Sequence, residues 1–135
     1  MGVVLGLLGA VAIAAPVLAA RHQAGVMGAF PPPLLVAPIL VLALGGNLLE
    51  ETLFRGWLQG LLTKEMGAFG AAWASAAFFA MCHVPLAVAV TGLGWPVVGF
   101  TFYEGAVCAG LRMRWGLAPA VLAHGLGIIA LAAGP

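Results

Sequence analysis

Six ionisable residues lie inside long apolar stretches of this sequence: Glu50, Glu51, Arg55, His83, Glu104 and His124. On insertion scales a charged side chain at the centre of a bilayer costs about 3 kcal/mol, and such residues are retained where they face protein or water, usually for a function. Carboxylates and imidazoles act as general bases, as proton donors or as metal ligands. We therefore take these residues as the candidate functional site, suited to acid–base or metal-assisted chemistry.

The segment Gly45–Gly56 has helical length and carries Glu50, Glu51 and Arg55. Glu51 and Arg55 are four residues apart, so they share one helical face and are expected to form an ion pair that holds the helix in place. Glu50 is rotated by about 100 degrees from Glu51. We therefore expect the two carboxylates to serve different targets, with Glu50 facing a cavity as a general base. The alternative is a charge cluster at a helix end, but the apolar pattern continues beyond Arg55.

Two further helices are each expected to carry one histidine. Phe79 and His83 are four residues apart and share a helical face, and His124 lies in the last apolar stretch. A single membrane histidine is often only hydrogen-bonded to a neighbouring helix. Because buried polar groups need partners, the two histidines and the Glu-Glu-Arg set are the strongest candidates for one another. Glu104 belongs to no motif, and its role as a neutralising charge, a ligand or a substrate contact stays open.

The residue types exclude several protease mechanisms. The sequence has no aspartate, which excludes an aspartyl dyad, and no His-Glu-x-x-His zinc motif. The only serine, Ser75, lies eight residues before His83, which is about 12 Å along a helix and too far for a nucleophile and its base. Cys82 is adjacent to His83 and points elsewhere. What remains is a water activated by glutamate and histidine, or a metal such as zinc held by Glu50, His83 and His124.

Three motifs stand in order along the chain: Glu50-Glu51-x-x-x-Arg55, Phe79-x-x-x-His83, and His124 after Arg114–Pro119. Together, over residues 45–130, they resemble the CAAX protease and bacteriocin-processing family, which includes the Ras-converting endoprotease. The resemblance implies a glutamic-type intramembrane endopeptidase with a four-helix core, acting on membrane-associated or prenylated CAAX-type proteins or peptides. It implies that Glu50 and His83 activate the attacking water and that His124 stabilises the oxyanion. No cofactor is required in this interpretation, and a zinc-dependent site is the alternative.

One position departs from the family pattern. The family often has asparagine four residues after the last histidine, where this chain has Ile128, which cannot donate a hydrogen bond. Oxyanion stabilisation would then rest on His124, a backbone N–H or another side chain, and Asn47, on a different helix, is not assumed to substitute. The departure keeps open a non-catalytic immunity or adaptor protein on the same scaffold, or a small ion-conducting bundle that uses the glutamates.

The composition indicates which elements position these residues. Hydrophobic residues make up 64% of the 135 residues and charged residues 7%, whereas soluble domains have about 25% charged residues. Five apolar stretches approach the roughly 20 residues that a membrane-spanning helix needs. They cover about residues 2–20, 33–63, 68–90, 96–111 and 117–133, with breaks at Phe30–Pro33, Lys64–Gly67, Thr91–Pro96 and Arg112–Gly116. We therefore expect an all-α, polytopic transmembrane helix bundle of about five spans, in contact with membrane lipid. A net charge of +1 argues against a nucleic-acid partner.

We divide the chain into a first transmembrane helix with its loop, residues 1–32, and a protease core, residues 33–135. The first helix lacks the preceding positive charge of a secretory signal, so we expect it to be retained. The second and fourth loops hold three basic residues, Lys64, Arg112 and Arg114, against Arg21 alone in the first and third. The positive-inside rule therefore predicts an inside N-terminus and an outside C-terminus. We expect a bacterial-type cytoplasmic membrane as the location.

Overall fold

The computed structural model describes residues 1–25 and 33–133, which form helices and turns without any β-strand. The elements in chain order are α1 (Gly2–Gln23), α2 (Pro33–Val41), η1 (Leu42–Gly46), α3 (Asn47–Glu51), η2 (Thr52–Leu58), α4 (Gln59–Cys82), η3 (Leu86–Val90), α5 (Trp95–Trp115) and α6 (Leu117–Ala133). The η elements are wider helical turns between or after the α-helices. The predicted all-α fold is thus confirmed for the described residues, whereas the break expected at Phe30–Pro33 lies mostly outside them.

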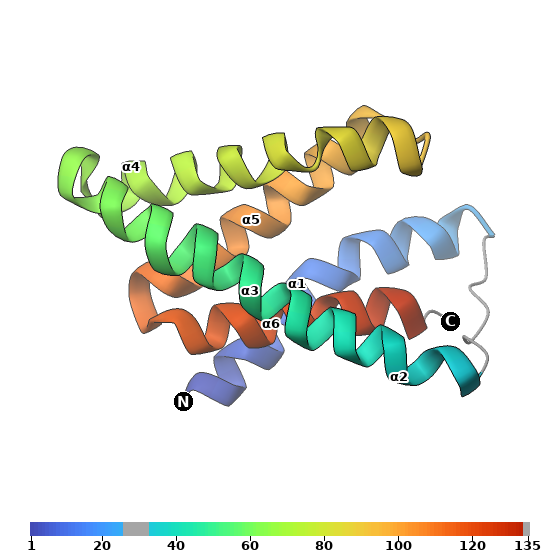
Figure 1. Cartoon of the computed structure of the whole chain (residues 1–135). Coiled ribbons are helices and arrows are strands. Elements are labelled where there is room, and N and C mark those ends of the chain that lie inside the picture. Colours follow the sequence, from blue (N-terminus) through green and yellow to red (C-terminus); the bar gives the residue numbers. More distant parts are fainter. Residues whose placement is uncertain (26–32, 134–135) are drawn as a thin grey trace.

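The chain reverses direction within α4, at Gly67. Helical residues run from Pro33 to Met66, and Figure 1 shows that the remainder of α4 then returns towards the opposite end of the bundle. Gly67 has φ 75° and ψ 168°, a conformation that residues with a side chain rarely adopt and that glycine reaches easily. The turn that the sequence predicts at Lys64–Gly67 is therefore confirmed.

The helices are long and apolar enough to cross a membrane. The helix Gly2–Gln23 and the helical run Pro33–Val90, which doubles back on itself, both qualify, and Leu117–Ala132 is a shorter apolar helix. Large apolar side chains on the outside are widely exposed, as for Leu34 in α2, which is the surface that lipid tails require. These features confirm the predicted transmembrane helix bundle.

Helix α5 is longer than the sequence predicts. It ends at Trp115 instead of near Leu111, so Arg112 and Arg114 belong to its last turn. The helix dipole favours cations at a C-terminal end, which explains why the helix continues through both arginines. Gly116, with φ 91°, then makes a one-residue junction to α6, at the same end of the bundle as the reversal in α4 (Figure 1).

Small residues bring α1 and α6 into close contact, and this contact fixes the helix that carries His124. A methyl group added at Gly9 would lie 2.6 Å from Ala123 Cβ, and one added at Gly127 would lie 2.9 Å from Ile13 Cγ2. Real Cβ atoms essentially never approach so closely, so these crossings need glycine. Close backbone approach through small residues is a common basis of helix packing in membranes.

Candidate active site

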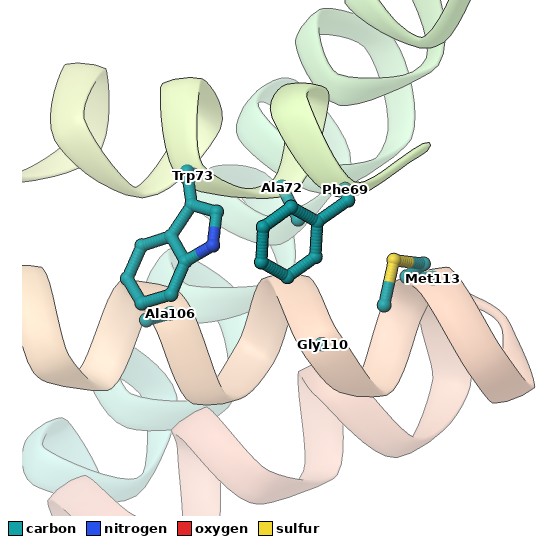
Figure 2. Close-up of a pocket in the computed structure, with 6 residues that line it drawn as sticks. All are labelled: Phe69, Ala72, Trp73, Ala106, Gly110 and Met113. Carbon is teal, nitrogen blue, oxygen red and sulfur yellow. The ribbon is translucent and has the colours of Figure 1, made fainter. Parts of the chain in front are cut away.

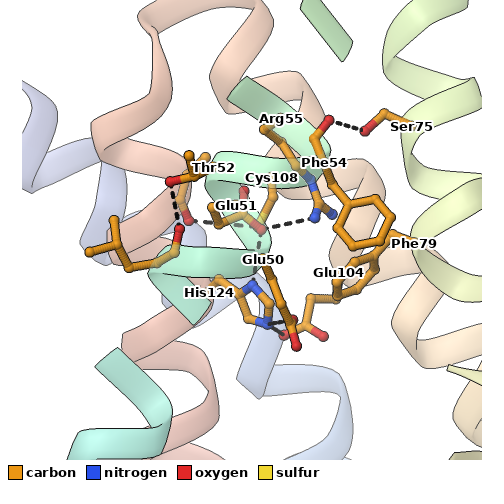
Figure 3. A network of polar contacts seen from close by, with 12 residues as sticks. Glu50, Glu51, Thr52, Phe54, Arg55, Ser75, Phe79, Glu104, Cys108 and His124 are labelled. Atoms are coloured by element: carbon orange, nitrogen blue, oxygen red, sulfur yellow. Dashed lines mark hydrogen bonds and ion pairs between the residues drawn. The ribbon is translucent and has the colours of Figure 1, made fainter. Parts of the chain in front are cut away.

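The short helix α3 carries Glu50 and Glu51, and the following element η2 carries Arg55. The wide turns η1 and η2 flank α3, and helical irregularities of this kind are frequent at functional sites. Glu51 and Arg55 are fully buried, and Arg55 Nη1 lies 3.0 Å from Glu51 Oε1 (Figure 3). The ion pair that their spacing predicts is therefore confirmed.

Phe79 is the apolar side chain around which the candidate site packs. The guanidinium carbon of Arg55 lies 4.3 Å from the centre of the Phe79 ring, within the range of a cation–π contact. The ring centres of His83 and His124 lie 4.4 and 5.6 Å from that of Phe79. Arg55 makes no hydrogen bond of good geometry among the described residues, so the Glu51 carboxylate and this ring are what stabilise its buried charge.

His124 connects carboxylates from two other helical segments. Its Nδ1 lies 2.9 Å from Glu51 Oε1, while its Nε2 lies 3.6 Å from Glu104 Oε1 and 4.0 Å from Glu50 Oε2. Glu51 pairs with Arg55 and Glu50 lines a cavity, as the sequence predicts, but the expectation that the two carboxylates share no target is wrong, because both approach the same imidazole. The two carboxylates point in different directions from α3, as expected, and the His124 ring lies between them (Figure 3). Its Nδ1 faces Glu51 and its Nε2 faces Glu50.

His83 directly follows α4 and contacts Phe79, as the four-residue spacing predicts. Its Nδ1 lies 2.8 Å from the Phe79 carbonyl oxygen. A carbonyl oxygen only accepts hydrogen bonds, so Nδ1 carries the hydrogen, and Nε2 of the neutral ring carries the lone pair. This tautomer, assigned from the hydrogen bond, leaves His83 Nε2 as an acceptor.

One cavity of about 470 Å³ brings the three predicted catalytic residues together. Its polar lining includes Glu50, His83 and His124, and also Asn47 and Glu104. Most of the other lining side chains are apolar, as is usual for a pocket in which a few polar groups fix the orientation of a ligand. The cavity therefore combines acid–base groups with room for a hydrophobic chain.

Glu104 is the member of this cavity whose role the sequence left open. Its side chain is almost completely buried, and its Oε1 has no hydrogen-bond partner among the described residues. The sequence indicates that Glu104 is unusual, because it is an acidic residue in an apolar stretch. Its approach to His124 could not be predicted, because that contact depends on how α5 packs against α6. The Glu51–Arg55 ion pair, by contrast, is not part of the cavity lining, which agrees with a supporting position.

A second, smaller pocket lies between α4 and α5 (Figure 2). It measures about 110 Å³ and is lined by Phe69, Ala72, Trp73, Ala106, Gly110 and Met113. None of these side chains exchanges protons near neutral pH. The larger cavity is therefore the candidate active site.

The alternative from the sequence is a zinc ion held by Glu50, His83 and His124. In the structure, the ligand atoms of these three residues are not close enough together to form such a group. Among the described residues, the ligand atoms that all lie within 4.8 Å of one another belong to Glu51, Cys108 and His124. Glu51 Oε1 in that group already faces the Arg55 guanidinium, whose charge disfavours a further cation beside it. A metal held by Glu50, His83 and His124 stays a prediction that chelation can test.

Comparison with known proteins gives a match to a family model over most of the chain. The family is described as Rce1-like, type II CAAX prenyl endopeptidase Rce1-like, and its model matches residues 32–127. The matched range includes all three motifs on which the resemblance rests. No curated protein and no solved structure matches the chain.

Proposed function

This chain belongs to the Rce1-like family of type II CAAX prenyl endopeptidases, and from this premise we propose that it hydrolyses peptide bonds with a water activated by Glu50 and His83. Family membership and the apolar helices make it a membrane protease of the CAAX type. The observation that supports water activation by Glu50 and His83 is the single cavity lined by Glu50, His83 and His124.

In the proposed first step, the water oxygen attacks the carbonyl carbon of the scissile peptide while Glu50 accepts a proton from the water. The Glu50 side chain is 37% exposed and lies 4.0 Å from its nearest charged partner, His124, so its carboxylate is accessible to a water. His83 Nε2, as an acceptor, would hold the second hydrogen of that water. Glu50 then passes its proton to the leaving nitrogen as the carbon–nitrogen bond breaks.

We assign oxyanion stabilisation to His124 in its doubly protonated form. Nδ1 donates to Glu51, so only the doubly protonated ring also carries a hydrogen on Nε2, the nitrogen beside Glu50 and Glu104. Three carboxylates lie within 4.0 Å of this ring, and their negative charges stabilise the imidazolium. A preorganised donor for developing negative charge is usually the largest contribution to such a reaction.

As the substrate we propose a membrane-associated or prenylated CAAX-type protein or peptide, whose apolar part would occupy the apolar lining around Ile39, Leu42 and Phe100.

We propose a bacterial-type cytoplasmic membrane as the location of the protein, with the N-terminus and Lys64 inside. The orientation was predicted by placing Lys64, Arg112 and Arg114 on the same side of the membrane. Figure 1 supports this placement, because the reversal in α4 and the α5–α6 junction lie at one end of the bundle. The mechanism needs no cofactor.

The proposed function is tested by mapping cleaved protein termini by mass spectrometry in native membranes. We expect termini that are present with the wild type and with Glu65→Ala, a change of an exposed glutamate, but absent with Glu50→Ala and His83→Ala. Identical sets of termini from all four proteins would contradict a protease and favour an immunity or adaptor protein on the same scaffold.

The metal-dependent alternative is tested on the purified protein. We expect cleavage to continue after treatment with a strong chelator. Loss of cleavage on chelation, followed by its recovery on addition of zinc, would replace activation by Glu50 and His83 with a zinc mechanism that uses Glu50, His83 and His124.

A further inference from the structure

Hydrolysis of a peptide places negative charge on the carbonyl oxygen, and that oxygen needs N–H or O–H donors that are not used elsewhere. Two of the donors that line the cavity have other partners. Thr101 Oγ1 donates to the Val98 carbonyl oxygen, 3.0 Å away. His83 Nδ1 donates to the Phe79 carbonyl oxygen, which leaves Nε2 as an acceptor. Of Thr101, His83 and His124, only His124 could therefore donate to the oxyanion, and its Nε2 also faces two carboxylates.

Asn47 supplies a donor that nothing in the described part of the chain uses. Its side chain lines the cavity and is only 8% exposed, and its Nδ2 has no hydrogen-bond partner among the described residues. A buried N–H group without a partner is costly, by about 1–3 kcal/mol, unless a ligand or water satisfies it. Because the Asn47 side chain lines the cavity, a donor without a partner there points to a ligand oxygen as its partner.

The position of Asn47 on α3 brings this donor beside the proposed base. Asn47 lies three residues before Glu50, so the two side chains are neighbours on one helical face, with their Cβ atoms about 5–6 Å apart. Side chains on a helix lean towards its N-terminus, which directs Glu50 over the turn that begins at Asn47. A carbonyl carbon attacked by a water on Glu50 would therefore have its oxygen within reach of Asn47.

We propose that Asn47 is a catalytic residue whose Nδ2–H donates to the carbonyl oxygen of the scissile peptide, an inference that rests on the proposed protease function. As the water oxygen bonds to the carbon, the carbonyl electron pair moves onto this oxygen, and its hydrogen bonds to Asn47 and His124 strengthen. When the carbon–nitrogen bond breaks, the pair returns and the bonds weaken. Asn47 thereby supplies, from α3, the amide that the apolar Ile128 of the same cavity does not supply from α6.

The test measures kcat and KM of the purified protein on a farnesylated peptide that ends in a CAAX sequence. Loss of one oxyanion donor lowers kcat by about 100-fold to 1,000-fold in well-studied enzymes. We expect a loss of this size in Asn47→Ala and in the equally sized Asn47→Asp, with KM close to that of the wild type. Gln59→Ala removes another buried amide, which lies outside the cavity, and should leave kcat close to that of the wild type.

A rescue variant separates this role from a structural one. Ile128→Asn places an amide in the same cavity, one helical turn after His124, and we expect the Asn47→Ala, Ile128→Asn double variant to regain at least about tenfold in kcat over Asn47→Ala. A wild-type kcat in folded Asn47→Ala and Asn47→Asp, or a loss confined to KM, would overturn the role of Asn47 while leaving the protease function intact. Failure of the wild type to cleave the peptide, together with unchanged termini in membranes, would overturn both.

Discussion

His124 donates its Nδ1 hydrogen to Glu51 Oε1 over 2.9 Å, although the two residues are 73 positions apart. The same Glu51 oxygen lies 3.0 Å from Arg55 Nη1. One fully buried carboxylate oxygen therefore links the first motif to the last. This relationship fixes the orientation of the imidazole, so that Nε2 faces Glu104 and Glu50.

Removal of the Arg55 charge should destabilise the fold strongly. Arg55→Met leaves the buried Glu51 carboxylate without its cation, and breaking one partner of a buried ion pair costs about 3–5 kcal/mol. The measurement is the free energy of unfolding in detergent micelles. The double variant Glu51→Gln, Arg55→Met should be less destabilised than the sum of the two single variants. Simple additivity would show that the two side chains are not coupled.

Phe79→Ala should also destabilise the fold, by about 3–5 kcal/mol, because it leaves a cavity beside Arg55, His83 and His124. The control is Phe78→Ala at the preceding position, whose side chain is 49% exposed and does not belong to the buried core. Its effect should be much smaller when both variants are unfolded under the same conditions. Equal losses from the two variants would contradict the central packing position of Phe79.

A methyl group at Gly105 should disturb the same cluster. An added Cβ there would lie 3.0 Å from Arg55 Nη2 and 3.2 Å from Phe79 Cδ1, and overpacking of this kind costs about 1–3 kcal/mol. Gly99→Ala on the same helix meets nothing within 4 Å and should be neutral or stabilising, since alanine favours helix formation. A lower melting temperature for Gly105→Ala than for Gly99→Ala is the expected result, and the reverse order would contradict it.

Replacement of Glu104 should affect catalysis more than the fold. Glu104→Gln keeps the size of the side chain but removes one of the charges that stabilise His124 in the proposed mechanism. We expect kcat on the farnesylated peptide to fall by about tenfold or more, a modest loss for a group that supports acid–base catalysis. Glu65→Gln, at an exposed position, is the control. Equal kcat values for both variants would mean that Glu104 has no part in the reaction.

The local pairs of the site could be predicted from the sequence because helix geometry alone determines them. The Glu51–Arg55 ion pair and the Phe79–His83 contact both follow from a spacing of four residues. Contacts between helices could not be predicted in the same way. A helix that is apolar on all sides carries no stripe that marks its buried face, so the approach of Glu104 to His124 depended on rotations that the sequence does not reveal.

The same reasoning applies to Asn47 and to the shared imidazole. From spacing alone, Glu50 and Glu51 diverge, and only the position of α6 brings His124 between them. Asn47 on α3 was not expected to compensate for Ile128 on α6, yet both side chains line one cavity. The sequence places Asn47 and His124 within apolar stretches. The partners of these two residues, in contrast, depend on the three-dimensional packing.

The central claim is that Glu50 activates the attacking water, and the most direct measurement is kcat of purified Glu50→Gln on the farnesylated CAAX peptide. The variant keeps the size of the side chain, and Glu50 is partly exposed to the cavity, so its thermal stability should stay close to that of the wild type. We predict that kcat falls by at least about 100-fold, as expected when a general base is lost. A folded Glu50→Gln variant that cleaves the peptide at the wild-type rate would contradict the mechanism.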